Sequence, residues 1–235
     1  DALGKYEEAI ACYDEVIRFW PEFYIAWTSK GKTLVSLGKS EEAIACYDKV
    51  IMFEDPLHSE SALYEKGRVL HDQEKYEEAI VCYDEAIRLH NPVAFTTVDP
   101  YFTWMNKSHA LHSLGKYEET IACYDEIIQW NPEHLDVWVN KGKTLDLLKR
   151  YEEAIACYDE AIRLDPELSV AWNNKCSTLD ELERYEEALA CCDEAIRLDP
   201  EYFNAWNNKC YTLKKLGRHE EAEQSFAKAK ELDES

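Results

Sequence analysis

A motif of twelve residues recurs seven times along the chain, and no other feature constrains the fold as strongly. Its first copy, YEEAIACYDEVI, begins at Tyr6, and copies with small changes begin at Ser40, Tyr76, Tyr117, Tyr151, Tyr185 and His219. The copies start 34, 36, 41, 34, 34 and 34 residues apart. Self-similarity at such a period is typical of arrays whose supersecondary units bury their apolar faces on one another. The sequence therefore predicts a stack of similar units rather than one globular core.

Each unit is predicted to be a pair of helices. In residues 135–168, apolar and small residues recur at i, i+4 and i+7 in both halves: Trp138, Gly142 and Leu145, then Ala154, Tyr158 and Ala161. Pro166 should end the second helix, because proline disfavours the α conformation in the residue before it. Small residues at the position of Gly142 should let the two helices approach closely. Each unit thus reads as a helical hairpin.

This pattern resembles the tetratricopeptide repeat, whose landmarks are Trp, Gly, Tyr, Ala, Tyr, Ala and Pro over 34 residues. The resemblance covers essentially the whole chain. It implies an all-α fold, a right-handed superhelical solenoid of antiparallel helix pairs, as a single array over residues 1–235. A partial repeat occupies residues 1–21, and full repeats begin at Tyr24, Glu60, Tyr101, Leu135, Ser169 and Phe203. Places within a repeat are numbered below from these first residues.

The chain departs from the family at place 7, where leucine is usual and every full repeat has lysine: Lys30, Lys66, Lys107, Lys141, Lys175 and Lys209. Place 7 lies about 60° from the centre of the apolar stripe at 100° per residue. We expect the lysine stem to cover apolar surface while the amine reaches water. A catalytic lysine is the much less favoured alternative. A second departure is Leu63, which replaces tryptophan.

The two ends of the array differ. Isoleucine positions that should contact the next repeat become Glu223 and Lys230 in the last copy, which is typical of a terminal cap. Residues 1–4 read as the last turn of a first helix whose body is absent, which would leave Tyr13 without its hairpin partner. We therefore expect a fragment of a longer protein or a processed chain. Self-association through this uncapped N-terminal repeat is a further expectation.

Charge and cysteine usage narrow the class of protein. There are 48 acidic and 26 basic residues, a formal net charge of −22, which argues against nucleic acid and anionic membranes as partners. No apolar run of about 18 residues suggests a membrane span, and no signal peptide is apparent.

Six of the nine cysteines recur at one place of successive repeats, and Cys191 and Cys192 should point to different sides of a helix. We predict reduced thiols without chemistry and a cytoplasmic location.

Two insertions interrupt the period. Two extra residues fall near 55–59, and seven fall between Asn91 and Pro100. Long connections in compact arrays often carry function, but a tolerated surface loop or an extended helix turn is an equally good interpretation.

A binding surface is expected on the face opposite the packing stripe. Places 2, 5, 6, 9, 12 and 13 of the first helices lie roughly 80 to 200° from that stripe and should line a groove when units stack. Place 6 is asparagine in four consecutive repeats, here called the asparagine row: Asn106, Asn140, Asn174 and Asn208. An amide can pair in a two-pronged way with a peptide unit whatever the ligand's side chains are. The row resembles the asparagine ladder of superhelical tetratricopeptide proteins. Alternatively, it came with repeat duplication and is merely solvated.

Other groove residues would set the preference for a ligand. The candidates for peptide contacts are His109, Lys143, Asn173, Asn207, Tyr211 and Lys214. Acidic groove residues are Asp136, Asp146, Asp180 and Glu181, so the groove should be mixed in charge. The lysine and asparagine pattern with which this family clamps the carboxylate tails of chaperones is not present.

No catalytic or metal-binding motif stands out. His109 and His112 share a helix face, with His71 at place 12 of the preceding repeat, but without a carboxylate or thiolate partner they predict polar contacts rather than metal. We expect no cofactor, no metal and no enzymatic activity. The favoured function is a scaffold or adaptor that binds an extended protein or peptide segment in its groove. The alternatives are a targeting arm of a larger enzyme or a self-assembling scaffold.

Overall fold

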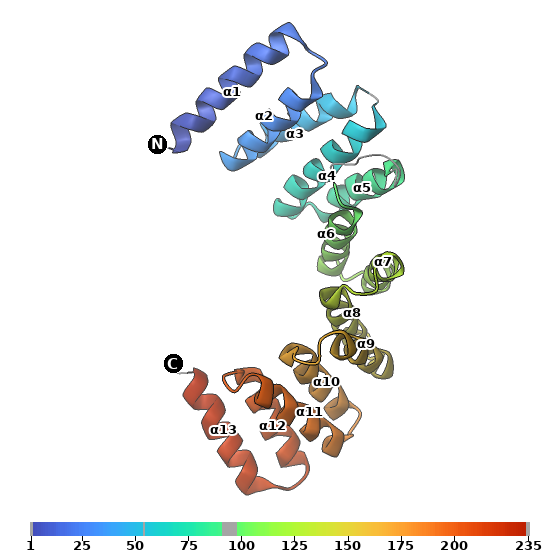
Figure 1. Cartoon of the computed structure of the whole chain (residues 1–235), viewed down its shortest axis with the longest axis vertical. Helices are drawn as coiled ribbons and strands as arrows, with labels where there is room; N and C mark the ends of the chain where they lie inside the picture. The colour runs from blue at the N-terminus through green and yellow to red at the C-terminus, as the bar shows by residue number, and fades with distance from the viewer. Residues whose placement is uncertain (1, 54, 91–97, 234–235) are drawn as a thin grey trace. The chain divides into compact units, whose positions relative to one another are not determined.

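The computed structural model describes residues 2–53, 55–90 and 98–233, and every regular element in these ranges is an α-helix (Figure 1). The chain divides into two compact units, Asp1–Cys123 and Tyr124–Ser235. Unit 1 contains α1 (Ala2–Phe19), α2 (Tyr24–Ser36), α3 (Ser40–Ile51), α4 (Pro56–Asp72), α5 (Tyr76–Leu89) and α6 (Pro100–Ser113). The division falls within α7 (Tyr117–Trp130). Unit 2 contains α8 (Leu135–Leu147), α9 (Tyr151–Leu164), α10 (Ser169–Glu181), α11 (Tyr185–Leu198), α12 (Phe203–Lys215) and α13 (His219–Asp233).

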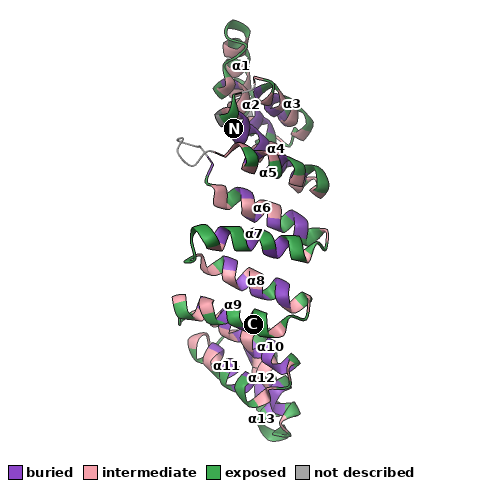
Figure 2. Ribbon diagram, turned by 90° about the vertical axis from the view of Figure 1, so that its right-hand side faces the viewer, coloured by how far each residue is buried: buried purple, intermediate pink, exposed green. Residues whose placement is uncertain are grey.

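Consecutive helices pack on one another in each unit, as the hairpin prediction requires. The closest pairs are α2 with α3, α4 with α5, α8 with α9, α10 with α11, and α12 with α13. Within each unit, hairpins also contact one another through a second helix, for example α3 with α4 and α9 with α10. Buried residues lie along the helix sides that face these neighbours (Figure 2). The apolar stripes of these helices are thus covered both inside a hairpin and between hairpins.

The first helix of each hairpin ends at a residue in the left-handed conformation. Gly38 has φ of 73°, and the next backbone amide, of Lys39, donates to the carbonyl of Leu34 at 2.9 Å. This return bond satisfies a carbonyl that the helix end leaves open. Lys149 takes the same conformation with φ of 58°, which costs a non-glycine residue free energy. The turn is therefore imposed by the packing of the hairpin as well as by residue preference.

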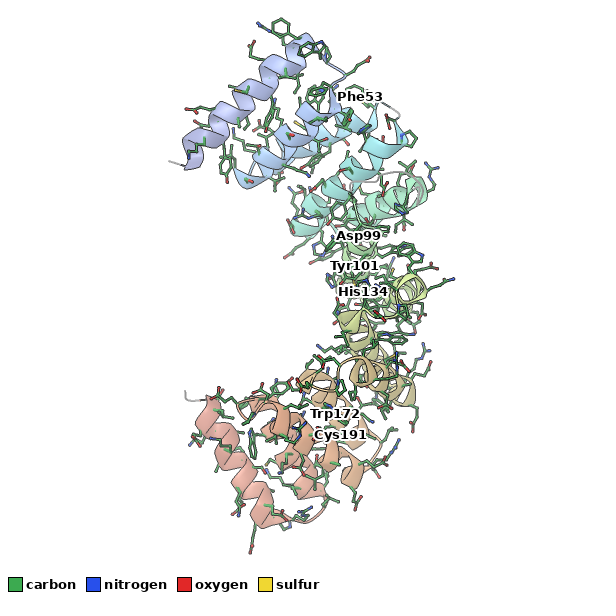
Figure 3. All side chains as sticks on the ribbon, viewed as in Figure 1. Phe53, Asp99, Tyr101, His134, Trp172 and Cys191 are labelled. Carbon is green, nitrogen blue, oxygen red and sulfur yellow. A yellow bond between two sulfur atoms is a disulfide. The ribbon has the colours of Figure 1, made fainter. Side chains whose placement is uncertain are left out.

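Helix starts and connections agree with the sequence where they are described. The Asp99 carboxylate accepts from the backbone amide of Tyr101 at 3.0 Å and caps α6, with Pro100 in its first turn (Figure 3). The first insertion lengthens a helix, because α4 already begins at Pro56. Residues 91–97 of the second insertion lie outside the described residues.

A tyrosine lies flat against a glycine inside three hairpins, which confirms the close approach predicted from small residues. Tyr47, Tyr83 and Tyr158 are fully buried, and a Cβ added at the facing glycine would lie 2.6, 2.6 and 2.5 Å from the ring. The glycines are Gly31, Gly67 and Gly142. Each tyrosine ring is therefore fixed in position by the backbone opposite it.

The tryptophans of the repeat are half-buried. The indole Nε1 of Trp27 donates to the carbonyl of Pro21 at 2.8 Å, and Trp172 donates to Pro166 at 3.1 Å. Figure 3 labels Trp172 on α10. The same bond recurs at Trp138 and Trp206. In these four hairpins the tryptophan thus ties the start of the hairpin to the proline that ends the preceding one.

The structure corrects two predictions. Cys176 and Cys192 form a disulfide, so these thiols are not reduced, and they occupy the places that glycine and tyrosine hold in other repeats. Two small side chains can bridge where glycine and tyrosine would pack. Residues 2–19 form one helix, so residues 2–4 belong to α1 and are not the last turn of a separate helix.

Candidate functional site

The first helices of successive hairpins contact one another, and they carry the asparagine row. In unit 2, α8 contacts α10 and α10 contacts α12, which brings Asn140, Asn174 and Asn208 to matching places on three neighbouring helices. In unit 1, Asn106 lies on α6, which contacts α4. All four side chains are half-buried. Within unit 2 the three asparagines thus lie at one repeat place on helices that contact one another.

The amides of the row differ in their partners. Asn208 Nδ2 donates to Asn173 Oδ1 at 2.9 Å, and Asn106 Nδ2 donates to the Tyr64 hydroxyl at 3.3 Å. The Nδ2 atom of Asn174 is buried and has no hydrogen-bond partner among the described residues. A buried amide without a partner costs about 1 to 3 kcal/mol. Asn174 is thus the member of the row whose buried amide nitrogen is left unsatisfied inside the fold.

The other predicted contact residues are exposed with one exception. His109, Lys143, Asn207, Tyr211 and Lys214 all reach solvent. Asn173 is only 6% exposed, and its side-chain oxygen accepts the hydrogen bond from the Asn208 amide. Asn173 therefore fixes the position of the Asn208 amide in the asparagine row.

Two of the acidic residues expected in the groove are used inside the fold instead. Asp146 accepts hydrogen bonds from the Tyr158 hydroxyl at 2.6 Å and from Thr178 Oγ1 at 2.9 Å. Asp180 is 7% exposed and accepts from Thr212 Oγ1 at 2.8 Å. Burial raises the pKa of Asp146 and raises that of Asp180 to about 6. They join successive hairpins, so the groove of unit 2 is less acidic than the sequence indicates.

The lysines of place 7 connect hairpins, because each amine is paired with a half-exposed aspartate. Each Nζ lies 2.5 to 2.6 Å from an aspartate on the preceding second helix: Asp14, Asp48, Asp84, Asp125, Asp159 and Asp193. The lysine side chains are 18 to 25% exposed. Lys175 Nζ also lies 5.9 Å from the Trp172 ring centroid. The recurring aspartate was the sequence signal for this pairing.

The histidines do not gather into a site. His71 packs edge-on against Tyr76, and His112 packs in the same way against Tyr117. In the part of the chain that the structure describes, no group of three or more His, Cys, Asp or Glu side chains could hold a metal ion. None of the described helices is long and apolar enough to cross a membrane.

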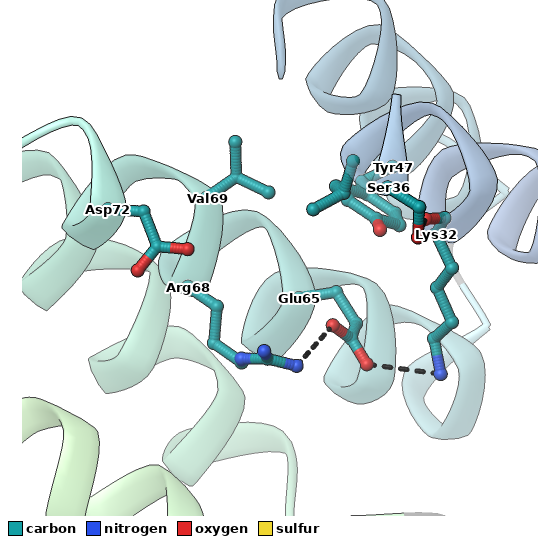
Figure 4. A pocket seen from close by; sticks show the side chains of 8 residues that line it. Lys32, Ser36, Tyr47, Glu65, Arg68, Val69 and Asp72 are labelled. Atoms are coloured by element: carbon teal, nitrogen blue, oxygen red, sulfur yellow. Dashed lines mark hydrogen bonds and ion pairs between the residues drawn. The ribbon is translucent and has the colours of Figure 1, made fainter. Parts of the chain in front are cut away.

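Sequence reasoning missed a cavity of about 290 Å³ in unit 1 (Figure 4). It is lined by groove places of α2 and α4 and by the ring of Tyr47 from α3, and is here called the α2–α4 cavity. A second cavity of about 180 Å³ shares Lys32 with it. The available signal was Val35, because place 12 is His or Asp in the next four full repeats and Lys in the last. Valine at this place cannot accept a hydrogen bond from the Tyr47 hydroxyl, as Asp146 does from Tyr158.

Comparison with known proteins agrees with the repeat pattern. Models of the tetratricopeptide repeat match residues 1–58, 61–90, 103–134, 135–168, 169–202 and 191–224. No curated protein matches the sequence. Among solved structures, YrrB, described as a TPR protein with an unusual peptide-binding site, is 22% identical with a TM-score of 0.69, over 84% of this chain and 97% of YrrB. A tetratricopeptide repeat protein from Parabacteroides merdae is 19% identical with a TM-score of 0.71, over 87% of this chain and 78% of its own. A MamA double mutant is 19% identical with a TM-score of 0.66, over 74% of this chain and 94% of its own.

Proposed function

The chain belongs to the tetratricopeptide repeat family, and we propose that it is a non-enzymatic scaffold that binds an extended segment of a partner protein. In each unit, the binding surface is the face formed by the first helices. Stacked repeats present extended surfaces of this kind to their partners. The fold supports the general role, and the asparagine row supports the form of the ligand.

The observation that carries the proposal is the repetition of one amide on neighbouring helices. Asn140, Asn174 and Asn208 recur every 34 residues on α8, α10 and α12, and the amide of Asn174 has unused donor capacity within the described residues. An extended peptide offers a carbonyl and an N–H at every residue, so regularly placed amides suit its backbone. Exposed Lys143, Asn207 and Tyr211 would then contact its side chains.

The peptide-binding site named in the description of YrrB favours the same use of this fold. The formal charge of −22 favours a partner segment that is not acidic. Lys143 and Lys214 lie among the proposed contacts, so an acidic residue of the partner would be tolerated only beside them.

A displayed library of random twelve-residue peptides tests the proposal without knowledge of the partner. Peptides selected on the wild-type chain are synthesised, and their affinities for N140A/N174A are measured by calorimetry. Because two hydrogen-bonding amides are lost, we expect binding to weaken more than tenfold, which corresponds to about 1.4 kcal/mol or more.

The matched control is Q129A/Q224A, which removes two exposed amides from the second helices α7 and α13 of unit 2. This variant should bind the selected peptides with unchanged affinity. Equal affinity of wild type and N140A/N174A would remove the asparagine row from the function.

A further inference from the structure

The three stacked tyrosines place their hydroxyl groups in comparable positions in both units. Tyr47 and Tyr158 are both fully buried, and each ring lies against a glycine at the same close separation. The surroundings of the hydroxyl then depend on place 12 of the same repeat and place 10 of the next. In unit 2 these places hold Asp146 and Thr178, and Tyr158 donates to Asp146 at 2.6 Å. This hydroxyl is satisfied inside the fold.

The corresponding places around Tyr47 in unit 1 are apolar. Val35 and Val69 stand where the later repeats have the aspartate and the threonine. The hydroxyl of Tyr47 is buried and has no hydrogen-bond partner among the described residues. Burial is also the main reason that the pKa of Tyr47 is raised, so the hydroxyl stays protonated and acts as a donor. Tyr47 is one of the residues that line the α2–α4 cavity, so the unused donor belongs to the wall of a space that a ligand group can enter (Figure 4).

The charges around the α2–α4 cavity cancel. Glu65 pairs with Lys32 at 3.0 Å and with Arg68 at 3.1 Å, as the dashed lines of Figure 4 show. Asp72 adds a second carboxylate to the rim. Two cations and two anions leave no net charge, and the whole chain is strongly acidic. A neutral group is therefore favoured over a carboxylate, which would meet Glu65 and Asp72, and over an ammonium, which cannot accept from Tyr47.

We propose that the α2–α4 cavity is a specificity pocket for an asparagine or glutamine side chain of the partner segment. The amide oxygen accepts from the Tyr47 hydroxyl, and the amide nitrogen donates to one of the two carboxylates that line the cavity, Glu65 or Asp72. The methylene stem packs between Val35 and Val69. This inference rests on the proposed function, because the pocket selects a residue within a peptide that the first-helix face binds.

The test selects random twelve-residue peptides separately on wild type and on V35D/V69T. The double variant copies the Asp146 and Thr178 arrangement into unit 1, so Tyr47 gains an internal acceptor and the cavity is partly filled. We expect glutamine or asparagine to be enriched at one peptide position on wild type, and the enrichment to be lost on V35D/V69T. Y47F keeps the fold without the donor, and it should bind the enriched peptide about five- to tenfold more weakly.

Matched synthetic peptides identify the group that is bound. Replacing the enriched amide residue by glutamate or by leucine should weaken binding to wild type at least tenfold, and both replacements should have little effect on V35D/V69T. Two results would refute the assignment of the α2–α4 cavity as an amide pocket. One is enrichment of acidic or apolar residues instead, and the other is an amide preference that survives in V35D/V69T and Y47F. In that case loss of binding in N140A/N174A would still uphold the proposed function. Failure to select any peptide on wild type would overturn both.

Discussion

Two tyrosines of this chain form a natural comparison for the value of one buried hydrogen bond. Tyr47 and Tyr158 are both fully buried and both stack on glycine, but only Tyr158 has a partner for its hydroxyl, the Asp146 carboxylate at 2.6 Å. Hydrogen bonds to charged groups contribute about 1.5 to 3 kcal/mol to stability. We predict that Y158F destabilises its surroundings by this amount.

Y47F should behave differently, because it removes no hydrogen bond. The free energy of unfolding should stay the same or rise by up to about 1 kcal/mol, since an unpaired buried hydroxyl is costly. Stacked repeats can unfold in stages, so the readout is native-state amide hydrogen exchange of α8 and α9 for Y158F and of α2 and α3 for Y47F. Equal protection losses in the two variants would show that ring packing alone governs these sites, and would refute the hydrogen-bond assignments.

Three further predictions concern contacts within unit 2. The pKa of Asp180 is raised to about 6 from 3.8, so the native state binds more protons than the unfolded state between these values. The difference in unfolding free energy between wild type and D180N should therefore fall as pH rises from about 4 to 6 and stay level above; a constant difference in urea titrations would contradict this. Reduction of the Cys176–Cys192 disulfide, which spans 16 residues, should cost about 3 kcal/mol in wild type and nothing in C176G/C192Y, measured by thermal unfolding with and without reductant. K175M should cost less than about 1 kcal/mol, because its partner Asp159 is half exposed, and a double-mutant cycle with D159N checks this.

Most of the fold could be predicted because it depends on local patterns. The period of the motif, the apolar stripes and the prolines located the hairpins, and the helix ends at Leu164 and Leu198 precede Pro166 and Pro200 as expected. The site was predicted less completely. A helical wheel identifies the face on which Asn174 and Asp146 lie, but it does not show what the neighbouring helix places opposite them.

The sequence alone determined that this chain forms helical hairpins with a repeated amide on their first helices, because both properties follow from spacing along the chain. Only the tertiary structure decided which of those side chains are already hydrogen-bonded inside the fold. Asn208 is hydrogen-bonded to Asn173, and Asp146 is hydrogen-bonded to Thr178. Each bond joins two hairpins, and the paired residues lie 35 and 32 positions apart in the sequence. Tyr47 has no such partner among the described residues, and valines, Val35 and Val69, hold the two places that carry Asp146 and Thr178 around Tyr158. Hydrogen bonding depends on distances of a few tenths of an ångström, which only the packed helices set.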